Sequence, residues 1–205
     1  MTQSADQSPL DYYLIVSQHN LAELQACLYL KPQRIILITT QSMQERAERL
    51  KKILAQRPQG SEIEILHEQL EGNRVKEIRE WVRNTLNARL RAGTQAGRRQ
   101  ILNMTGGNKI ISLILSNLDT SAGVAWEALH YQSIPDEKFA PQIEVFQIYE
   151  RDFRLQEPID LSAVQVPPLD ALCLYMDNPE NDPPKPWESS ALALQLAQER
   201  LDASL

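Results

Sequence analysis

Hydrophobic and polar positions along the first part of the chain fall into two alternating patterns. Four short runs are apolar or alternate with polar residues and predict strands, at residues 11–16, 34–39, 62–67 and 101–104. Other segments repeat apolar residues every three or four positions and predict helices, at residues 21–30, 41–56, 72–92 and 110–118. Strands that alternate with helices build right-handed βαβ units around a parallel sheet. The pattern therefore predicts an α/β fold, a Rossmann-like three-layer sandwich with a mainly parallel sheet.

The pattern changes in the second part of the chain. Residues 126–134 and 143–149 alternate loosely and predict a strand followed by a returning antiparallel strand. Prolines then punctuate the sequence, with a short helix expected at residues 168–175 and an amphipathic helix at residues 187–203, after a proline-rich stretch. We expect three parts: a disordered leader at residues 1–10, a ligand-binding domain at residues 11–150, and a helical, proline-rich extension or linker to a further effector domain at residues 151–205.

The predicted strand at residues 101–104 stops at Thr105-Gly106-Gly107, and a helix is expected to begin almost at once. The first N–H groups of a helix are unpaired and the helix dipole is positive there, so a helix start attracts anions. Glycines let a ligand approach the backbone, and Lys109 adds a positive charge. These features suit a phosphate. Paired glycines also make ordinary strand-to-helix turns, and the segment matches neither the Walker A nor the G-x-G-x-x-G pattern.

A second polar loop, Ser17-Gln18-His19-Asn20, follows the first predicted strand. Asn20 and Glu23 have the spacing of a helix N-cap and capping box. Ligands of open α/β sheets bind beyond the carboxyl ends of the strands. Both polar loops lie at such ends, as does Thr39 after the second strand.

The composition narrows the classes of partner. The chain of 205 residues carries a net charge of −6, which argues against binding DNA or a membrane surface through bulk charge. The N-terminus lacks the apolar core of a signal peptide and no run approaches ~18 apolar residues, so a cytoplasmic location is expected. Cys27 and Cys173 are expected to be buried, reduced thiols. The histidines show no ligand spacing, so we expect neither a metal nor another cofactor.

Residues Asn103-Met104-Thr105-Gly106-Gly107-Asn108-Lys109 resemble the Asn-φ-Thr-Gly-Gly-Thr-Lys signature of CARF domains, the CRISPR-associated Rossmann fold. The chain is most similar to the branch at the front of type III CRISPR effectors that join a CARF domain to a nuclease. Residues 17–21 resemble the polar first loop of that branch, residues 160–175 resemble the segment after its core, and the likeness covers residues 11–176. Asn108 departs from the usual threonine, and we recognise no nuclease, helix-turn-helix, deaminase or toxin domain after residue 176.

The resemblance implies a specific ligand and assembly. CARF domains form twofold dimers that bind a cyclic oligoadenylate, most often of four or six adenylates, across the dimer axis. A homodimer is therefore expected, and the predicted helix at residues 110–118, apolar on more than one face, suits its interface. The ligand-binding residues expected on this basis are Ser17, Gln18, His19, Asn20, Thr39, Met104, Thr105, Gly106, Gly107, Asn108 and Lys109.

The sequence leaves three functions open. The first is a sensor that binds a cyclic oligoadenylate and passes the signal to an effector. The second is a ring nuclease that cuts this ligand without a metal, by attack of a ribose 2′-OH on the adjacent phosphate, with His19 and Lys109 as candidate catalytic residues. The third is a Rossmann-like enzyme that uses a mononucleotide, which the lack of glycine in the first loop disfavours. Binding is favoured, with ring cleavage slow or absent, because the two loops offer few groups suited to proton transfer.

Overall fold

The computed structural model describes residues 8–58, 60–66, 74–118, 125–132, 141–149 and 152–174. Four expectations lie wholly or mostly outside the described residues: the leader, the helix start at Gly72-Asn73, the proline-rich stretch at residues 178–186 and the helix at residues 187–203.

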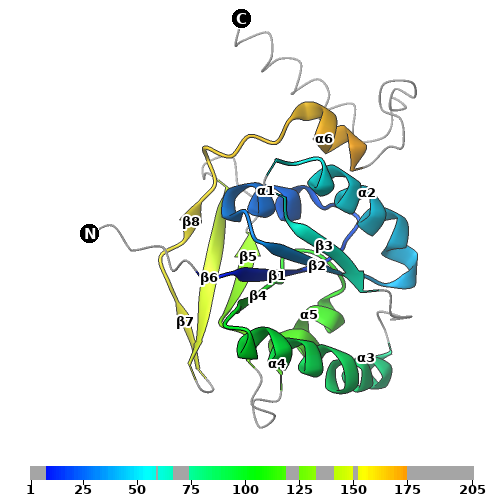
Figure 1. The fold of residues 1–205 in the computed structure, drawn as a ribbon, viewed down its shortest axis with the longest axis vertical. Helices are drawn as coiled ribbons and strands as arrows, with labels where there is room; N and C mark the ends of the chain where they lie inside the picture. The colour runs from blue at the N-terminus through cyan, green and yellow to red at the C-terminus, as the bar shows by residue number, and fades with distance from the viewer. Residues whose placement is uncertain are drawn as a thin grey trace, which may run out of the picture.

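Within the described residues, eight strands form one mixed sheet (Figure 1). The strands are β1 (Leu10–Ile15), β2 (Arg34–Ile38), β3 (Glu62–Leu66), β4 (Arg99–Asn103), β5 (Ala128–Gln132), β6 (Gln142–Tyr149), β7 (Asp152–Leu155) and β8 (Ile159–Asp160). Their order is β3-β2-β1-β4-β5-β6-β7, with β8 also paired to β6. The first five are parallel to one another, and β6 returns antiparallel to β5. The expected parallel sheet and its antiparallel partner strand are therefore confirmed.

Helices cover both faces of this sheet. The described helices are α1 (Leu21–Leu30), α2 (Gln44–Ala55), α3 (Val75–Trp81), α4 (Asn87–Gln95), α5 (Lys109–Ser116) and α6 (Pro168–Cys173). In Figure 1, α1 and α2 lie above the sheet and α3, α4 and α5 lie below it, while α6 lies beyond α2. Arg57 after α2 forms an ion pair with Asp170 of α6. The three-layer Rossmann-like sandwich expected from the sequence is confirmed.

The strand pattern explains the two-sided core. Successive side chains of a strand point to opposite faces, and every residue of β1 is buried. Tyr12 and Leu14 pack in the apolar cluster under α1 and α2. Tyr13 and Ile15 pack in a second cluster with residues of α3 and α5. A central parallel strand buried on both faces must be apolar almost throughout, as β1 and β2 are.

Two features differ from the sequence-based expectation. The helix expected at residues 72–92 contains a π-helical turn at Val82–Leu86 between α3 and α4. The strands β7 and β8 were not predicted; they lie in the segment where prolines are frequent and extend the sheet past β6. Phe153 and Leu155 of β7 are 48% and 62% exposed, so this strand lacks the buried alternation that identifies strands from sequence.

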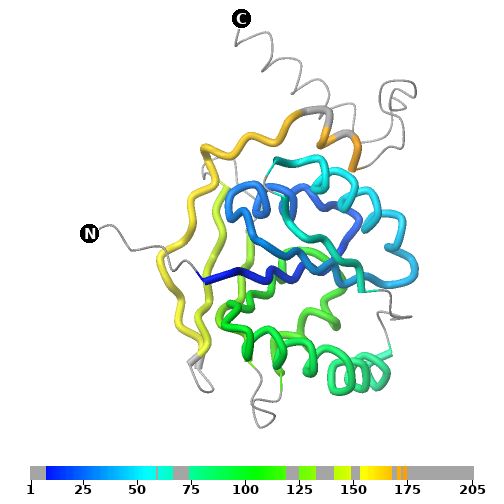
Figure 2. The backbone as a smooth tube through the Cα atoms, in the orientation of Figure 1, coloured from blue at the N-terminus to red at the C-terminus, as the bar shows by residue number. Residues whose placement is uncertain are grey.

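The order of the strands creates one distinctive position. From β1 the chain proceeds outward to β2 and β3, then returns to place β4 on the other side of β1 (Figure 2). The connections after β1 and β4 therefore leave the sheet in opposite directions, and in open α/β sheets such a switch point is where ligands bind. None of the helices in the described part of the chain is long and apolar enough to cross a membrane.

Candidate functional site

The first loop at this switch point connects β1 to α1 and is shaped by Asn20. The Asn20 side-chain oxygen accepts a hydrogen bond from the Ser17 N–H at 2.9 Å, and its amide nitrogen donates to the Ser17 carbonyl at 3.0 Å. The Ser17 hydroxyl donates to the His19 carbonyl at 2.8 Å. Asn20 is only 1% exposed, so its amide holds the loop in shape, while Gln18 and His19 remain exposed.

The capping box expected at the start of α1 is wrong. The Asn20 side chain makes no capping hydrogen bond to the helix, because both of its polar groups are used by Ser17. The partner expected at the third position, Glu23, is 1% exposed and points into the protein. Within the described part of the chain, neither of its carboxyl oxygens has a hydrogen-bond partner on another residue. The spacing was that of a capping box, but tertiary packing gives both side chains other surroundings.

The second loop, residues 104–108, connects β4 to α5 and is anchored at both ends. The Thr105 N–H donates to the Asn103 side-chain oxygen at 2.8 Å, and the Thr105 hydroxyl accepts from the Gln132 N–H of β5 at 2.7 Å. The Asn108 side chain accepts from the Ile110 N–H at 2.8 Å and so caps α5. Asparagine thus fills a structural role where related signatures carry threonine. Lys109 is the first residue of α5 and is exposed.

The two glycines allow this loop to touch the end of β1. Gly106 is buried, and a Cβ atom built on it would lie 2.8 Å from the Ile15 carbonyl oxygen and collide with the Glu23 carboxyl. Gly107 has a φ of +82°, which side-chain-bearing residues rarely adopt, and a Cβ there would collide with the Ile15 side chain. The first loop, the Thr-Gly-Gly segment and the start of α5 therefore all lie at the same end of the sheet, where the carboxyl ends of β1 and β4 are adjacent.

The expected site residues differ in how accessible they are. Gln18, His19, Asn108 and Lys109 are exposed, whereas Ser17, Met104, Thr105 and Gly107 are partly exposed and Asn20, Thr39 and Gly106 are buried. Thr39 lies beyond the neighbouring strand β2, and its hydroxyl donates to the Thr40 carbonyl at 3.1 Å. The accessible groups include a cation, amides and the start of a helix, a combination that favours an anionic ligand.

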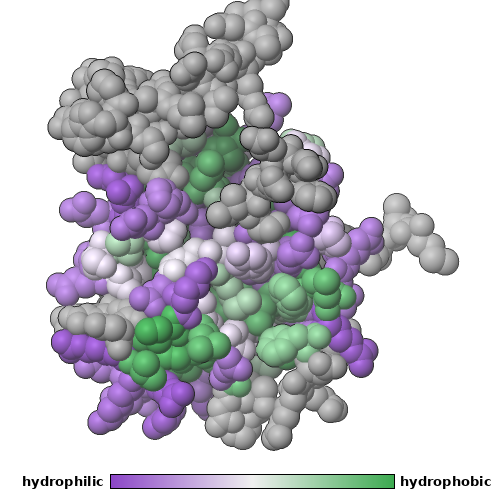
Figure 3. All heavy atoms as spheres, turned by 180° about the vertical axis from the view of Figure 1, so that it is seen from behind, coloured by the Kyte–Doolittle hydropathy of each residue, from purple (hydrophilic) through white to green (hydrophobic). Residues whose placement is uncertain are grey.

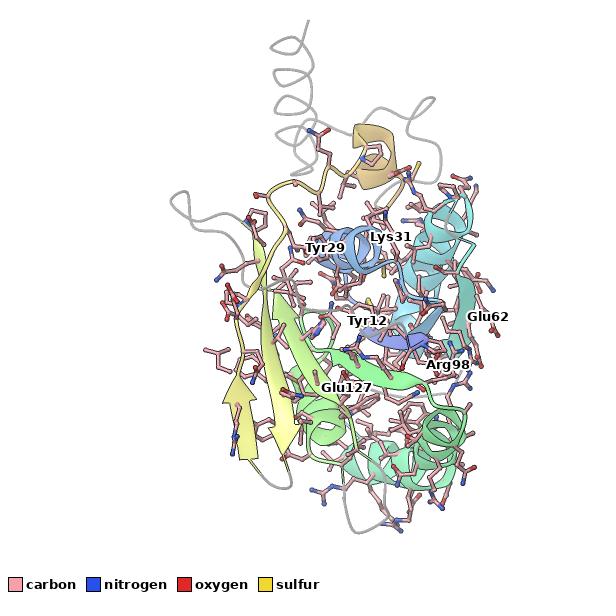
Figure 4. All side chains as sticks on the ribbon, turned by 60° about the vertical axis from the view of Figure 1, so that its left-hand side comes forward. Tyr12, Tyr29, Lys31, Glu62, Arg98 and Glu127 are labelled. Atoms are coloured by element: carbon pink, nitrogen blue, oxygen red, sulfur yellow. The ribbon has the colours of Figure 1, made fainter. Side chains whose placement is uncertain are left out.

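A cluster of buried polar side chains lies close to the Thr-Gly-Gly segment, between α1 and the sheet, and sequence reasoning missed it. It comprises Tyr12, Glu23, Cys27, Asn103, His130 and Gln132, none more than 5% exposed. Figure 4 shows Tyr12 beneath α1. The Tyr12 hydroxyl and His130 Nδ1 are 3.2 Å apart. The Asn103 amide nitrogen and the Gln132 side-chain oxygen lack hydrogen-bond partners, as do both oxygens of Glu23. Buried polar atoms without partners are rare in folded proteins.

Burial shifts the pKa of the titratable members of this cluster. It raises the pKa of Glu23 from its usual 4.5 to about 7, opposed only by the main-chain N–H of the same residue. It lowers the pKa of His130 to about 4, with a smaller contribution from the positive charge of Arg99, so this imidazole is neutral near pH 7. Burial also raises the pKa of Tyr12 and of Cys27, and the charge of Glu23 adds to both shifts.

A signal for Glu23 was present in the sequence. It lies one, three and four residues from Leu24, Ala26 and Cys27, which form the buried side of α1. A carboxyl group on the buried side of an otherwise apolar helix is a candidate functional group. No group of three or more histidine, cysteine or acidic residues suited to a metal ion occurs among the described residues. Cys27 is buried and Cys173 is partly buried, and both are free thiols.

The Rossmann-like fold and the Thr-Gly-Gly helix start after β4 are the features expected of a CARF domain, and comparison of the sequence with protein families identifies one. The family model described as the Card1 CARF domain matches residues 14–157, which is most of the chain. The chain therefore belongs to the Card1 CARF domain family. A search of curated proteins found no match.

Solved structures with the same fold include large, distantly related proteins. Csm6 of Enterococcus italicus, bound to cyclic hexa-2'-fluoro-hexa-dAMP, is 13% identical with a TM-score of 0.54, covering 85% of this chain and 41% of that one. A type III CRISPR defence DNA nuclease activated by cyclic oligoadenylate is 18% identical with a TM-score of 0.52, covering 82% of this chain and 23% of that one. Protein VC1899 from Vibrio cholerae is 15% identical with a TM-score of 0.56, covering 80% of this chain and 39% of that one. The chain spans less than half the length of each.

Proposed function

We propose that this chain is a sensor domain that binds a cyclic oligoadenylate across a homodimer axis and relays the signal to an effector. The observation that carries the proposal is that the first loop, the Thr-Gly-Gly segment and Lys109 at the start of α5 all follow the carboxyl ends of the neighbouring parallel strands β1 and β4. Membership of the CARF family supports it. So do two proteins of the same fold, one solved with a cyclic hexa-adenylate analogue and one activated by cyclic oligoadenylate.

An acidic chain needs local groups to hold a ring of phosphates. The net charge of −6 provides no general attraction for a polyanion. The attraction comes instead from the positive dipole of α5, from those of its first N–H groups that Asn108 does not cap, and from the ammonium group of Lys109. Gly106 and Gly107 let this backbone pack closely against the end of β1, because a side chain at either position would collide with Ile15. The exposed side chains of Gln18 and His19 lie in the neighbouring loop, where they would contact ribose or adenine.

A homodimer would present two copies of this site to one symmetric ring. Ile110 and Leu113 on α5 are 38% and 65% exposed. Figure 3 shows apolar surface on the side of the molecule opposite to that of Figure 1. Burying such surface between two copies is favourable by about 25 cal/mol per Å². We expect the mass of a dimer in light scattering at micromolar concentration, and the mass of a monomer would contradict this arrangement.

The phosphate role of Lys109 is tested by Lys109→Ala. Losing a charge-assisted contact costs about 1.5–3 kcal/mol, and a symmetric dimer loses two, so affinity for cyclic tetra- or hexa-adenylate should fall at least about tenfold. Lys52→Ala is the matched control, because Lys52 is an exposed lysine in the last turn of α2, whose charge does not belong to the site. Calorimetric titration measures both affinities. Unchanged affinity of Lys109→Ala, with an unchanged melting temperature, would contradict the role.

The alternative function is a metal-independent ring nuclease, favoured by one observation: His19 is exposed within the first loop. There it could take a proton from a ribose 2′-OH, while Lys109 stabilises charge on the phosphate. We expect binding to dominate, because the groups at the site bind a ground-state phosphate as well as a transition state. A single-turnover incubation with protein in excess distinguishes the two functions. Complete conversion to linear products within minutes, lost in His19→Ala, would establish the nuclease instead.

A further inference from the structure

We propose that Glu23 is a positioning residue that couples proton uptake to the binding of a phosphate at the Thr-Gly-Gly segment, being neutral whenever the ligand is bound. The inference rests on the proposed function, because it concerns the same site. It assigns a role to a side chain that lies beneath the loop and does not itself reach the surface: Glu23 is 1% exposed.

Geometry places Glu23 directly behind the ligand-facing backbone. Its carboxyl oxygen lies so close to Gly106 that any side chain at position 106 would collide with it. Gly106 also lies against the end of β1, since its Cβ position is 2.8 Å from the Ile15 carbonyl oxygen. The Glu23 carboxyl and the Ile15 carbonyl therefore support the Thr-Gly-Gly segment from below. A ligand on the outer side of this segment would be separated from the carboxyl group by one layer of backbone.

Among the described residues, no cation forms an ion pair with this carboxyl group, and neither oxygen has a hydrogen-bond partner on another residue. Facing it are the Tyr12 hydroxyl from β1 and the Cys27 thiol from its own helix, and the pKa of each is raised partly by Glu23. His130 from β5 is neutral near pH 7 and shares its Nδ1 with the Tyr12 hydroxyl. Asn103 from β4 adds an amide nitrogen that has no hydrogen-bond partner among the described residues. Outside this cluster, Lys109 and His19 are the charged or titratable groups of the two site loops.

Burial already holds the pKa of Glu23 near 7, so its charged and neutral forms are both populated at neutral pH. Placing a phosphate beyond the thin layer of Gly106 adds a second negative charge in a poorly hydrated region. Like charges in such surroundings strongly disfavour the ionised form of a carboxyl group. Binding should therefore draw a proton onto Glu23, and the neutral acid can donate a hydrogen bond that the carboxylate cannot.

The pH dependence of affinity tests this coupling in the full chain, with cyclic tetra-adenylate and cyclic hexa-adenylate as probes. His19 belongs to the same expected site, so the measurements use the His19→Gln background, which leaves Glu23 as the group under test. There, affinity should fall about tenfold between pH 6 and pH 8 for each Glu23 that takes up a proton, and so up to about a hundredfold for a ring contacting two protomers. Adding Glu23→Gln, which mimics the neutral acid, should reduce the change to less than about twofold. Glu157→Gln, at an exposed acidic residue, should leave the full change in place.

Calorimetry of the unmutated protein gives a second measurement that requires no variant to fold. Titrations in two buffers of different ionisation enthalpy report the protons taken up on binding, and we expect about 0.7 per bound protomer at pH 7.5. Uptake near zero, or the same pH dependence with and without Glu23→Gln, would overturn the coupling while leaving the proposed ligand intact. No binding of either ring at any pH would overturn the proposed function and this inference together.

Discussion

The two ends of β1 hold buried carboxyl groups in opposite electrostatic surroundings. Asp11, near the amino end, and Glu23, packed at the carboxyl end, are each 1% exposed. Asp11 accepts from Arg98 Nε at 2.5 Å and from Gln100 Nε2 at 3.2 Å, and lies 3.6 Å from a guanidinium nitrogen of Arg34. Arg98 comes directly before β4, at the amino end of the central strands and so at the opposite end of the sheet from the two loops. Glu23 has no such partner.

The difference separates the end of the sheet that stabilises the fold from the end at which we propose that a ligand binds. The two cations and the amide around Asp11 offset much of the free-energy cost of burying its carboxylate. This group therefore has a structural role. A buried carboxyl without partners costs stability and persists where something else uses it. The two groups are otherwise alike in chemistry and burial, so substitutions at each isolate the effect of pairing.

The largest expected loss of stability follows from substitution of Asp11, the carboxylate that is paired with arginines. Asp11→Ala leaves Arg98 and Arg34 without their buried partner and should lower the free energy of unfolding by about 3 kcal/mol. This value is at the lower end of the range for broken buried ion pairs, because both arginines are partly exposed. Glu62→Ala is the control: Glu62 pairs with the same Arg34 at 3.2 Å but is 66% exposed, so its loss should cost under about 1 kcal/mol. Urea unfolding followed by circular dichroism measures both. Equal costs would show that pairing at Asp11 is no more than a surface contact.

The second expected effect concerns the close packing of Gly106 against Glu23 and the carboxyl end of β1. Gly106→Ala puts a methyl group against the Ile15 carbonyl and the Glu23 carboxyl, and such overpacking costs about 1–3 kcal/mol. The substitution should also move the Thr-Gly-Gly segment and weaken cyclic oligoadenylate binding. Gly97→Ala is a stringent control, because Gly97 has a φ of +69° yet nothing within 4 Å of its Cβ position. It should lose about 1 kcal/mol of stability to backbone strain but retain binding. If Gly106→Ala binds as tightly as Gly97→Ala, the close approach does not matter to the site.

Some features of the sheet and its two ends could be predicted from the sequence, and others could not. The central strands and their helices were predictable because continuous apolar runs and helical periodicity identify them, and the Thr-Gly-Gly segment was predictable because it interrupts that pattern. The role of Glu23 was not, because its spacing from Asn20 matches a local capping motif and only the packing of α1 on the sheet shows that it points inward. The partners of Asp11 come from β2 and the start of β4, and no local pattern reports contacts between distant segments.

The same limit applies to β7 and β8. Their side chains are mostly exposed, and short edge strands are held by backbone hydrogen bonds that any sequence without proline can make.

The roles of the expected ligand-binding residues remain predictions. The structure adds that Asn20 and Asn108 already use their side chains to shape the loop and to cap α5.

The smallest expected effect is a change with pH in the stability that Glu23 contributes, which the paired Asp11 serves to contrast. Folding raises the pKa of Glu23 from 4.5 to about 7, so the folded state holds this proton more tightly than the unfolded state. The stability that this provides is complete below pH 4.5 and is lost as the pH rises through 7. Glu23→Gln has no such proton to lose. Its stability relative to the unmutated protein should therefore increase by about 1 kcal/mol between pH 6 and pH 8.

The absolute gain at pH 8 should stay within about 1–2 kcal/mol, because the glutamine amide is also buried without a partner and carries its own desolvation cost. Urea midpoints of the ligand-free protein at pH 6, 7 and 8 measure the trend, and Glu157→Gln at an exposed position should show none. A difference between Glu23→Gln and the unmutated protein that stays constant with pH would mean that Glu23 keeps an ordinary pKa. The carboxyl group would then have a partner after all, and the contrast with Asp11 would disappear.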